Sequence, residues 1–495
     1  MRKFFFISTS VIIALLSISD NIFAQTPQEE YEAWKKRAMQ EYGKYRDDQV
    51  RSYREFREKA NAEYAMFMQE AWDRMGVKPA LEPPTEPEPP QPEPVPQGAE
   101  PTTEPIPFVE PVPSPKVEPT PVVPLPDVPA PAPTDPSFRI DFYGTSITLR
   151  ADKDKRPKLK SCDGVSVSKM WEQLAKKDFD PLLRDCMEKS RSLSLGDWGF
   201  VQLVRKVSSN YYGKENNEAV LMSAYLLCQS GLQCRLARMG NRLLLLMPFD
   251  CELMFNHPYI EIDGVNYFAL NMKDGEGEVE VFNRAFPNEH IGSLRMTQLP
   301  KLAMRAISKR SFSDKDPHVM TCDVSVNRNL IDFLNDYPLT PQWDYYALAS
   351  LSDSSKKALY ATMRLKIAGK NRVDAANILL HWVQTAFKYK TDEDQFGVER
   401  PLFADESLYY PYCDCEDRSI LFSNLVRDLL GLDVVLLHFP GHLATAVKFK
   451  ESVEGDYLDL HDGRYVVCDP TYIGAPVGMA MPQCKKQQVE VIMLK

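Results

Sequence analysis

The sequence predicts an α+β fold in which a helix packed on an antiparallel sheet is present twice, after a long N-terminal helix and a proline-rich linker. Two similar apolar patterns predict the repeated part. Residues 374–495 show a helical period followed by three strand-like runs, and residues 195–285 repeat that order at a shift of about 200 positions. An 11-residue aromatic period before a dense run of prolines predicts the N-terminal helix and the linker.

The elements of the C-terminal part are marked by their boundary residues. Apolar residues at helical spacing predict a helix over Glu416–Leu430, and Gly431 supplies a stop signal. The turn Pro440-Gly441 separates two strand-like runs, and Asp469-Pro470 ends a third. The three strands are expected at Asp433–Phe439, Leu443–Phe449 and Arg464–Cys468. This order can bring side chains at the element boundaries together.

Three of these boundary residues have the side chains of a cysteine nucleophile and its helpers. Cys415 precedes the helix, whose unpaired N–H groups and dipole favour a thiolate and supply donors for an acyl oxyanion. His442 starts the second strand as the expected general base, and Asp469 ends the third strand as the group that orients the imidazole. Cys413 is the rival nucleophile, but it lies before the helix cap, so Cys415 is preferred.

The motifs Cys415-Glu416-Asp417, Pro440-Gly441-His442 and Asp469-Pro470-Thr471 resemble those of the transglutaminase-like superfamily, a papain-related group of thiol enzymes. The resemblance covers about residues 374–495 and implies a papain-like core. It also implies thioester chemistry on amides, with the three boundary residues in the roles given above. Bacterial-type members with this compact motif are more often peptidases than cross-linking enzymes.

The predicted function is therefore that of an exported peptidase or amidase, with transfer of a glutamine acyl group to an amine as the less favoured reaction. No cofactor and no metal are expected, because Asp392-Glu393-Asp394 lacks the spacing of a calcium-binding loop and no zinc spacing occurs. Tyr409, Tyr410 and Tyr412 either line the acyl site or pack under a loop. The rival class is a non-catalytic envelope binding or scaffold protein with the same fold.

The first copy is predicted to be degenerate. Its helix and strands align with those of the C-terminal part, but the reactive residues do not recur. Glu215 aligns with the nucleophile, Arg242 with the histidine and Asn271 with the aspartate. An internal duplication with one inactive copy explains this pattern, and chance similarity of two short apolar patterns is the alternative.

The first 24 residues have the basic start and short apolar run of a secretory signal peptide, with cleavage expected near Ala24. The mature chain is expected to be periplasmic or secreted, without a membrane span. A net charge of −10 argues against binding to nucleic acid. Ten cysteines are spread from Cys162 to Cys484; a free Cys415 leaves an odd number, and the sequence does not reveal the pairing.

Residues 25–78 are expected to form one long helix. Aromatic pairs recur every 11 residues, close to three helical turns, so they form a stripe that a single polar helix cannot bury. The pairs are Tyr31/Trp34, Tyr42/Tyr45, Tyr53/Phe56 and Tyr64/Phe67. The stripe predicts either self-association or docking to an envelope partner.

Residues 79–136 contain 23 of the 39 prolines and are expected to be an extended, unpacked spacer. The degenerate copy is placed at 137–299, beginning with a hairpin at Phe138–Arg150, and residues 300–372 are expected to connect it to the catalytic domain at 373–495. The expected substrate is a protein or peptide; location alone suggests a cell-wall peptide.

Overall fold

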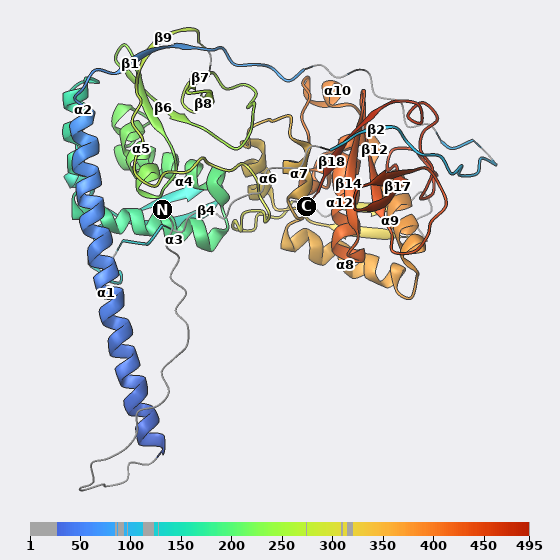
Figure 1. The fold of residues 1–495 in the computed structure, drawn as a ribbon, viewed down its shortest axis with the longest axis horizontal. Helices are drawn as coiled ribbons and strands as arrows, with labels where there is room; N and C mark the ends of the chain where they lie inside the picture. The colour runs from blue at the N-terminus through green and yellow to red at the C-terminus, as the bar shows by residue number, and fades with distance from the viewer. Residues whose placement is uncertain are drawn as a thin grey trace. The chain divides into compact units, whose positions relative to one another are not determined.

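The computed structural model describes residues 27–84, 87, 94–96, 98–111, 123–126, 128–273, 275–307, 310–313 and 320–494. It is a mixed α+β protein with antiparallel sheets and a long N-terminal helix (Figure 1). The chain divides into two compact units, Met1–Lys59 and Ala60–Lys495. The predicted signal peptide lies outside the described residues.

Helix α1 (Pro27–Phe67) carries the aromatic stripe, but the stripe has two environments. Its first two aromatic pairs, at Tyr31 to Tyr45, are more than half exposed. Tyr64 is buried, and its ring lies 4.9 Å from that of Trp171 and 5.0 Å from that of Phe282. The end of α1 is therefore part of the core of the larger unit.

The helix does not extend to residue 78, although the aromatic period predicted that it would. Residues Asp73–Val77 form strand β1, which pairs antiparallel with β9 (Gly277–Phe282). Trp72, just before β1, is buried, and its ring lies 5.8 Å from that of Phe282. Pairing with a distant strand has overridden the local helical pattern.

The first large sheet has the strand order β1-β9-β5-β6-β8-β7, and every neighbouring pair is antiparallel. Its other strands are β5 (Arg235–Met239), β6 (Arg242–Met247), β7 (Tyr259–Ile262) and β8 (Val265–Ala269). Helices α4 (Gly196–Tyr212) and α5 (Asn217–Gln229) pack against each other, and α5 also packs on the sheet. The region further contains β3 (Ser137–Phe142), β4 (Thr145–Arg150), α2 (Gly164–Leu174), α3 (Asp180–Leu193) and two short 3₁₀ turns at Lys153–Lys155 and Lys177–Phe179.

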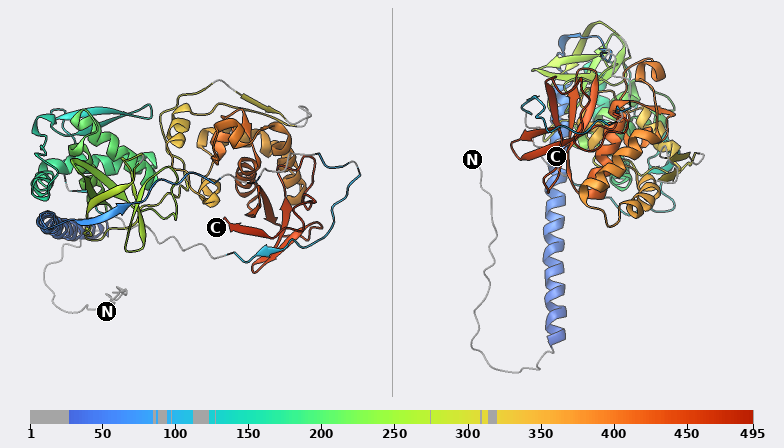
Figure 2. Two further views of the ribbon diagram at one scale, coloured as in Figure 1. Left: turned by 90° about the horizontal axis from the view of Figure 1, so that it is seen from above. Right: turned by 90° about the vertical axis from the view of Figure 1, so that its right-hand side faces the viewer.

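The second large sheet has the order β16-β17-β15-β14-β18-β2. Its strands are β14 (Asp433–Phe439), β15 (His442–Lys448), β16 (Tyr457–Leu460), β17 (Gly463–Cys468), β18 (Val489–Met493) and β2 (Phe108–Val109). Helices α9 (Arg372–Ala386) and α12 (Cys415–Leu430) pack against each other, and α12 packs on β14 and β15. Figure 2 shows the orange helices on one side of the red sheet. The predicted C-terminal helix and three strands are thus confirmed.

The remaining elements lie between the two sheets in the sequence or are inserted before α12. Residues 300–372 contain β10 (Arg310–Ser313), β11 (Thr321–Val324), α6 (Arg328–Asn335), α7 (Trp343–Leu348) and α8 (Asp353–Ile367). Residues 387–414 contain β12 (Lys388–Tyr389), α10 (Asp392–Phe396), α11 (Ala404–Ser407) and β13 (Tyr412–Cys413). Only residues 213–216 occupy the corresponding place between α4 and α5.

Part of the proline-rich segment is packed rather than free. Strand β2 lies parallel to β18 at the edge of the second sheet (Figure 1). Ile106, just before β2, is 2% exposed, and its backbone N–H donates to the carbonyl of Tyr457 at 2.8 Å. The N–H of Val95 donates to the carbonyl of Ile473 at 2.9 Å. The expected unpacked spacer is therefore wrong for these residues, because their backbone groups bind the second sheet and its following loop.

None of the helices in the described ranges is long and apolar enough to cross a membrane. All ten cysteines lie within the described residues, and each is buried with a free thiol. The sulfur atoms of Cys228 and Cys234 are 3.4 Å apart.

Candidate functional site

Cys415 is the first residue of α12, and its N-cap is Asp414, which has an extended backbone. The carboxylate of Asp417 fixes this helix start by accepting the N–H of Asp414 at 3.4 Å and that of Leu402 at 2.9 Å. Cys415 therefore lies beside the unpaired N–H groups of a helix N-terminus, as the sequence predicted. Its thiol donates to Oε2 of Glu416 at 2.9 Å.

His442 is the first residue of β15, after a turn in which Gly441 adopts a φ of 71°. Its Nε2 lies 2.9 Å from Oδ2 of Asp469, which directly follows β17. Both side chains are buried, at 3% and 1% exposure. Nδ1 of His442 is also buried, and it has no hydrogen-bond partner among the described residues. The pairing with Asp469 thus leaves the second ring nitrogen available.

The charge state of His442 depends on its neighbours. Burial alone would lower the pKa of His442. The negative charge and hydrogen bond of Asp469, together with the nearby charge of Cys415, raise that pKa to about 10. The raised pKa makes His442 a stronger proton acceptor, and the imidazolium that it forms stabilises an adjacent thiolate.

Asp469 is held by its own loop and by α9. Its Oδ1 accepts the N–H groups of Thr471 at 2.9 Å and Tyr472 at 3.2 Å. The side chain of Gln384 donates to the backbone carbonyl of Asp469 at 3.0 Å and accepts the N–H of Gly474 at 3.1 Å. These bonds orient the carboxylate toward His442 and supply a support that sequence spacing did not reveal.

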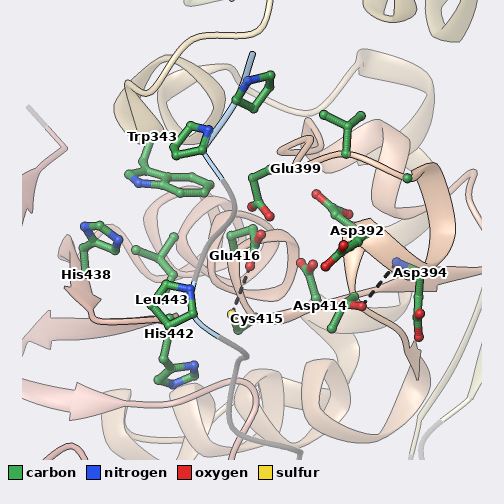
Figure 3. Close-up of a pocket in the computed structure, with 18 of the residues that line it drawn as sticks. Trp343, Asp392, Asp394, Glu399, Asp414, Cys415, Glu416, His438, His442 and Leu443 are labelled. Carbon is green, nitrogen blue, oxygen red and sulfur yellow. Dashed lines mark hydrogen bonds between the residues drawn. The ribbon is translucent and has the colours of Figure 1, made fainter. Parts of the chain in front are cut away.

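Cys415 and His442 line the same cavity, which has a volume of about 780 Å³ (Figure 3). Its wall also includes Glu82, Pro84 and Pro87 of the proline-rich segment. Asp469 does not line the cavity, but it is hydrogen-bonded to His442, which does. The structure therefore brings the three predicted residues into one site, two in the wall and one supporting them.

The other residues considered from the sequence have different surroundings. Cys413 is 1% exposed and does not line the cavity, and burial raises the pKa of its thiol to about 12. Tyr409, Tyr410 and Tyr412 are also absent from the lining. His438 does line it, with its ring 6.0 Å from that of Trp343.

Two aromatic residues of the site were not predicted. Trp343, from the connecting region, lines the cavity (Figure 3). Tyr389 does not line the cavity but lies beside the start of α12, where it pairs in register with Cys413, two residues before Cys415. Its buried hydroxyl has no hydrogen-bond partner among the described residues. Burial, followed by the charges of Cys415 and Asp414, raises the pKa of Tyr389. Only strand pairing places Tyr389 here, so no local sequence signal could have identified it.

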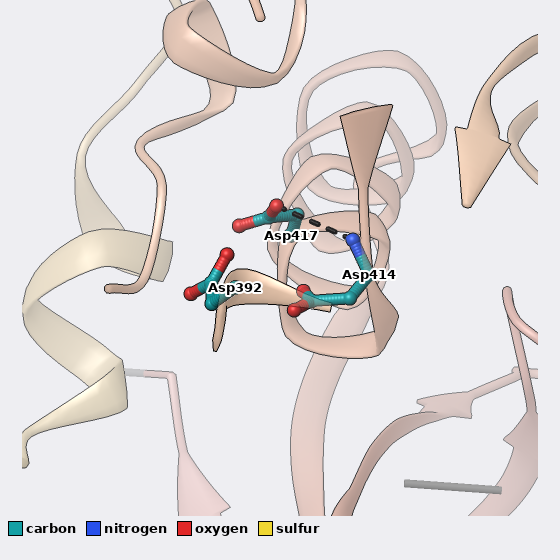
Figure 4. A group of neighbouring side chains, drawn as sticks. All are labelled: Asp392, Asp414 and Asp417. Atoms are coloured by element: carbon teal, nitrogen blue, oxygen red, sulfur yellow. Dashed lines mark hydrogen bonds between the residues drawn. The ribbon is translucent and has the colours of Figure 1, made fainter. Parts of the chain in front are cut away.

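Five acidic residues surround the start of α12. They form two overlapping groups, one of Asp392, Asp414 and Asp417 (Figure 4), and one of Asp392, Glu399 and Glu416, with one oxygen of each residue within 4.8 Å of the others in its group. Burial raises the pKa of Asp414 to about 7. Burial, followed by the charge of Asp414, also raises the pKa values of Asp392, Glu416 and Asp417. Oxygen atoms in this arrangement are the ligands that hard cations prefer.

No protein-family model, curated protein or solved structure significantly matches this chain. The function is therefore inferred from the site itself.

Proposed function

We propose that the protein is a cysteine-nucleophile enzyme that acts on amide or peptide bonds through a thioester, most directly as a peptidase or amidase. The observation that carries this proposal is the buried 2.9 Å contact between His442 and Asp469, which leaves Nδ1 of the imidazole unpartnered in the site that contains Cys415. A proposed kinship with transglutaminase-like enzymes rests on the same three residues and their motifs.

The reaction begins with transfer of the thiol proton of Cys415 to Nδ1 of His442. The raised pKa of His442 and the helix N-terminus both favour the resulting thiolate and imidazolium pair. Asp469 stabilises the imidazolium through Nε2 and keeps the ring in the orientation that presents Nδ1. The thiol must leave Glu416 for this transfer, since it donates to that carboxylate in the structure.

The thiolate then attacks the substrate carbonyl carbon, and a C–S bond forms as the carbonyl electrons move to oxygen. Backbone N–H groups at the start of α12 are donors for this oxyanion, and the unpartnered hydroxyl of Tyr389 is a further donor. Collapse of the intermediate breaks the C–N bond, and His442 gives its proton to the departing amine. A thioester on Cys415 remains.

Water completes the reaction when His442 removes its proton and the new hydroxyl displaces the thiolate, releasing a carboxylic acid. Transfer to an amine follows the same steps with nitrogen in place of water. Hydrolysis is favoured because water reaches an open site readily, and the described residues supply no evident device that favours an amine over water.

The shared frame of the two sheets supports a proposed duplication. In both regions two packed helices precede five strands, which are β5–β9 in the first and β14–β18 in the second. Strands that correspond in sequence order have corresponding neighbours, since the orders are β9-β5-β6-β8-β7 and β18-β14-β15-β17-β16. We propose that the first copy lacks the chemistry and that the second has a papain-like core. We also propose export of the mature chain, with the exposed aromatic residues of α1 mediating self-association or binding to an envelope partner.

A thiol-directed probe tests the proposed function. Iodoacetamide is expected to label Cys415 faster than any of the other nine cysteines, and p-nitrophenyl acetate is expected to acylate it as a thioester. Cys415→Ala should lose both products, whereas Cys413→Ser should retain them. Uniformly slow labelling, unchanged by Cys415→Ala, would instead support a scaffold protein. Incubation with peptide libraries, with and without an amine donor, then identifies the substrate class.

A further inference from the structure

Two cysteines in the region of the first large sheet take no part in the chemistry proposed for Cys415. Cys228 lies in the last turn of α5, and Cys234 directly precedes β5. Their sulfur atoms are 3.4 Å apart, and the two residues are only 2% and 1% exposed. No other two cysteines in the described part of the chain form a sulfur–sulfur hydrogen bond. This contact distinguishes the pair from the other eight thiols.

The turn between the two cysteines is held by hydrogen bonds. Gly231 reverses the chain after α5 with a φ of 89°, and its carbonyl accepts the N–H of His290 at 2.9 Å. The guanidinium of Arg235 donates to the carbonyl of Cys234 at 2.8 Å and forms an ion pair with Glu289 at 2.7 Å. The backbone near Cys234 is therefore fixed, and the fold itself presents one sulfur atom to the other.

A metal site does not explain the pair. Structural zinc sites usually have four protein ligands, but neither cysteine belongs to any group of three potential ligands among the described residues. The hydrogen bond with Cys234, followed by burial, raises the pKa of Cys228, which disfavours the thiolate that a metal binds. A covalent bond between the sulfur atoms requires them to approach by only about 1.4 Å, since a disulfide is about 2.0 Å long.

We propose that Cys228 and Cys234 form an intrachain disulfide that ties the end of α5 to the start of β5. The oxidant is the disulfide of a thiol compound such as oxidised glutathione. One protein thiolate attacks this disulfide, which releases one thiol of the oxidant and leaves a mixed disulfide. The second protein thiolate attacks the protein sulfur of the mixed disulfide and releases the other thiol. The two protons and two electrons that the protein loses are gained by the oxidant, and one S–S bond replaces another.

The buried position of the pair determines when the bond forms. Because both thiols are enclosed and Cys228 holds its proton, oxidation requires local opening or takes place during folding, before the core closes. Folding in an oxidising compartment, as proposed for the exported chain, supplies those conditions. The bond leaves eight thiols, including the proposed nucleophile Cys415, and does not depend on its chemistry.

The bond is tested on the full mature chain, first reduced with dithiothreitol and then kept with oxidised glutathione in urea below the unfolding transition. Free thiols are blocked with iodoacetamide in full denaturant, and the chain is digested with trypsin without reduction. The tryptic peptide 215–235 contains Cys228 and Cys234 and no other cysteine. Mass spectrometry should find this peptide without alkyl groups and lighter by two hydrogen atoms than its dithiol form. The oxidised chain should also melt about 3–6 °C above the reduced chain, because the bond restricts the unfolded state.

A peptide 215–235 that carries two alkyl groups after oxidation would overturn the proposal, as would bonds from its cysteines to glutathione or to other cysteines. This readout uses the wild-type chain, so it does not depend on the folding of a variant. Cys228→Ala should abolish the difference in melting temperature. Cys186→Ala is the matched control and should keep it, because Cys186 is buried in the same core without a sulfur contact. Cys415→Ala should form the same bond, so this test is independent of the proposed enzyme activity.

Discussion

The two large sheets have one strand order but different residues at the positions that carry chemistry in the second. His442 starts β15 and contacts Asp469 after β17. Arg242 starts the equivalent strand β6 and donates to the backbone carbonyl of Asn271 after β8. Both contacts join the start of one strand to the end of its neighbour. The first is suited to proton transfer, whereas the second is not, since arginine stays protonated and an amide does not titrate.

The helix starts differ in the same way. Asn217 is the first residue of α5, the place that Cys415 has in α12. Its side-chain oxygen accepts the N–H of Leu243 at 2.9 Å, so it joins the helix to the sheet. Glu215, which sequence alignment placed opposite Cys415, lies before the N-cap and forms a 3.5 Å ion pair with Arg205. The region of the first sheet therefore uses these positions for structure.

The largest difference is an insertion. Residues 387–414 separate α9 from α12, whereas residues 213–216 separate α4 from α5. Tyr389, Asp392 and Glu399 all belong to this longer segment. The candidate site thus combines different residues at equivalent strand positions with a longer connecting segment before α12.

Removal of the nucleophile should have the largest effect on the activity of the C-terminal site. Cys415→Ala is expected to reduce hydrolysis of p-nitrophenyl acetate by more than about 10³-fold, because no other cysteine lies at a helix start in the cavity. The hydrolysis rate of Cys413→Ser should stay within about 3-fold of the wild-type rate, since only modest repacking is expected. Comparable losses in the two variants would show that Cys415 is not the specific nucleophile.

Asp469→Asn should have the next largest effect. It gives the second sheet the residue type that the first sheet has at the corresponding position, Asn271. Acylation of Cys415 is expected to fall by about 10²–10⁴-fold. The charge of Asp469 raises the pKa of His442, so NMR titration of the imidazole should move to lower pH. Asp459→Asn, which removes an exposed partner of Arg464, is the control and should leave the titration in place.

Tyr389→Phe tests whether the inserted segment takes part in the chemistry. Acylation by p-nitrophenyl acetate, which passes through an oxyanion, should slow by about 10²-fold. Alkylation by iodoacetamide forms no oxyanion and should keep its rate. Tyr412→Phe, on the paired strand, is the control for both reagents. If both reactions slow equally in Tyr389→Phe, the tyrosine supports the local structure instead.

Asp414→Asn replaces the N-cap of α12 with the residue type found at Asn216, the N-cap of α5. Burial raises the pKa of Asp414 to about 7, so the folded state holds its proton more tightly than the unfolded chain. That stabilisation is complete below about pH 4 and is lost as pH rises through 7. At pH 8 with a chelator, the variant should be more stable by about 2 kcal/mol in urea unfolding, with little difference at pH 4. A variant that is less stable at pH 8 would contradict the assigned pKa.

Much of the C-terminal region could be predicted because its signals are local. The turn at Pro440-Gly441 and the proline after Asp469 mark strand ends, and each depends only on neighbouring residues. Strand β14 begins and ends where expected, and α12 begins one residue earlier, at Cys415. The reactive side chains were therefore placed at their element boundaries from the sequence alone.

Tertiary structure alone decided the rest, because pairing energy between distant segments does not appear in local sequence patterns. β1 lies in a stretch with helical periodicity, and β2 lies among prolines, yet each completes the edge of a sheet formed by residues much later in the chain. The meeting of Asp392 with Asp414, and of Tyr389 with the helix start, likewise depends on how residues 387–414 fold. The sequence by itself determined which residues stand at the element boundaries; the packing of the inserted segment decided which side chains surround the thiol.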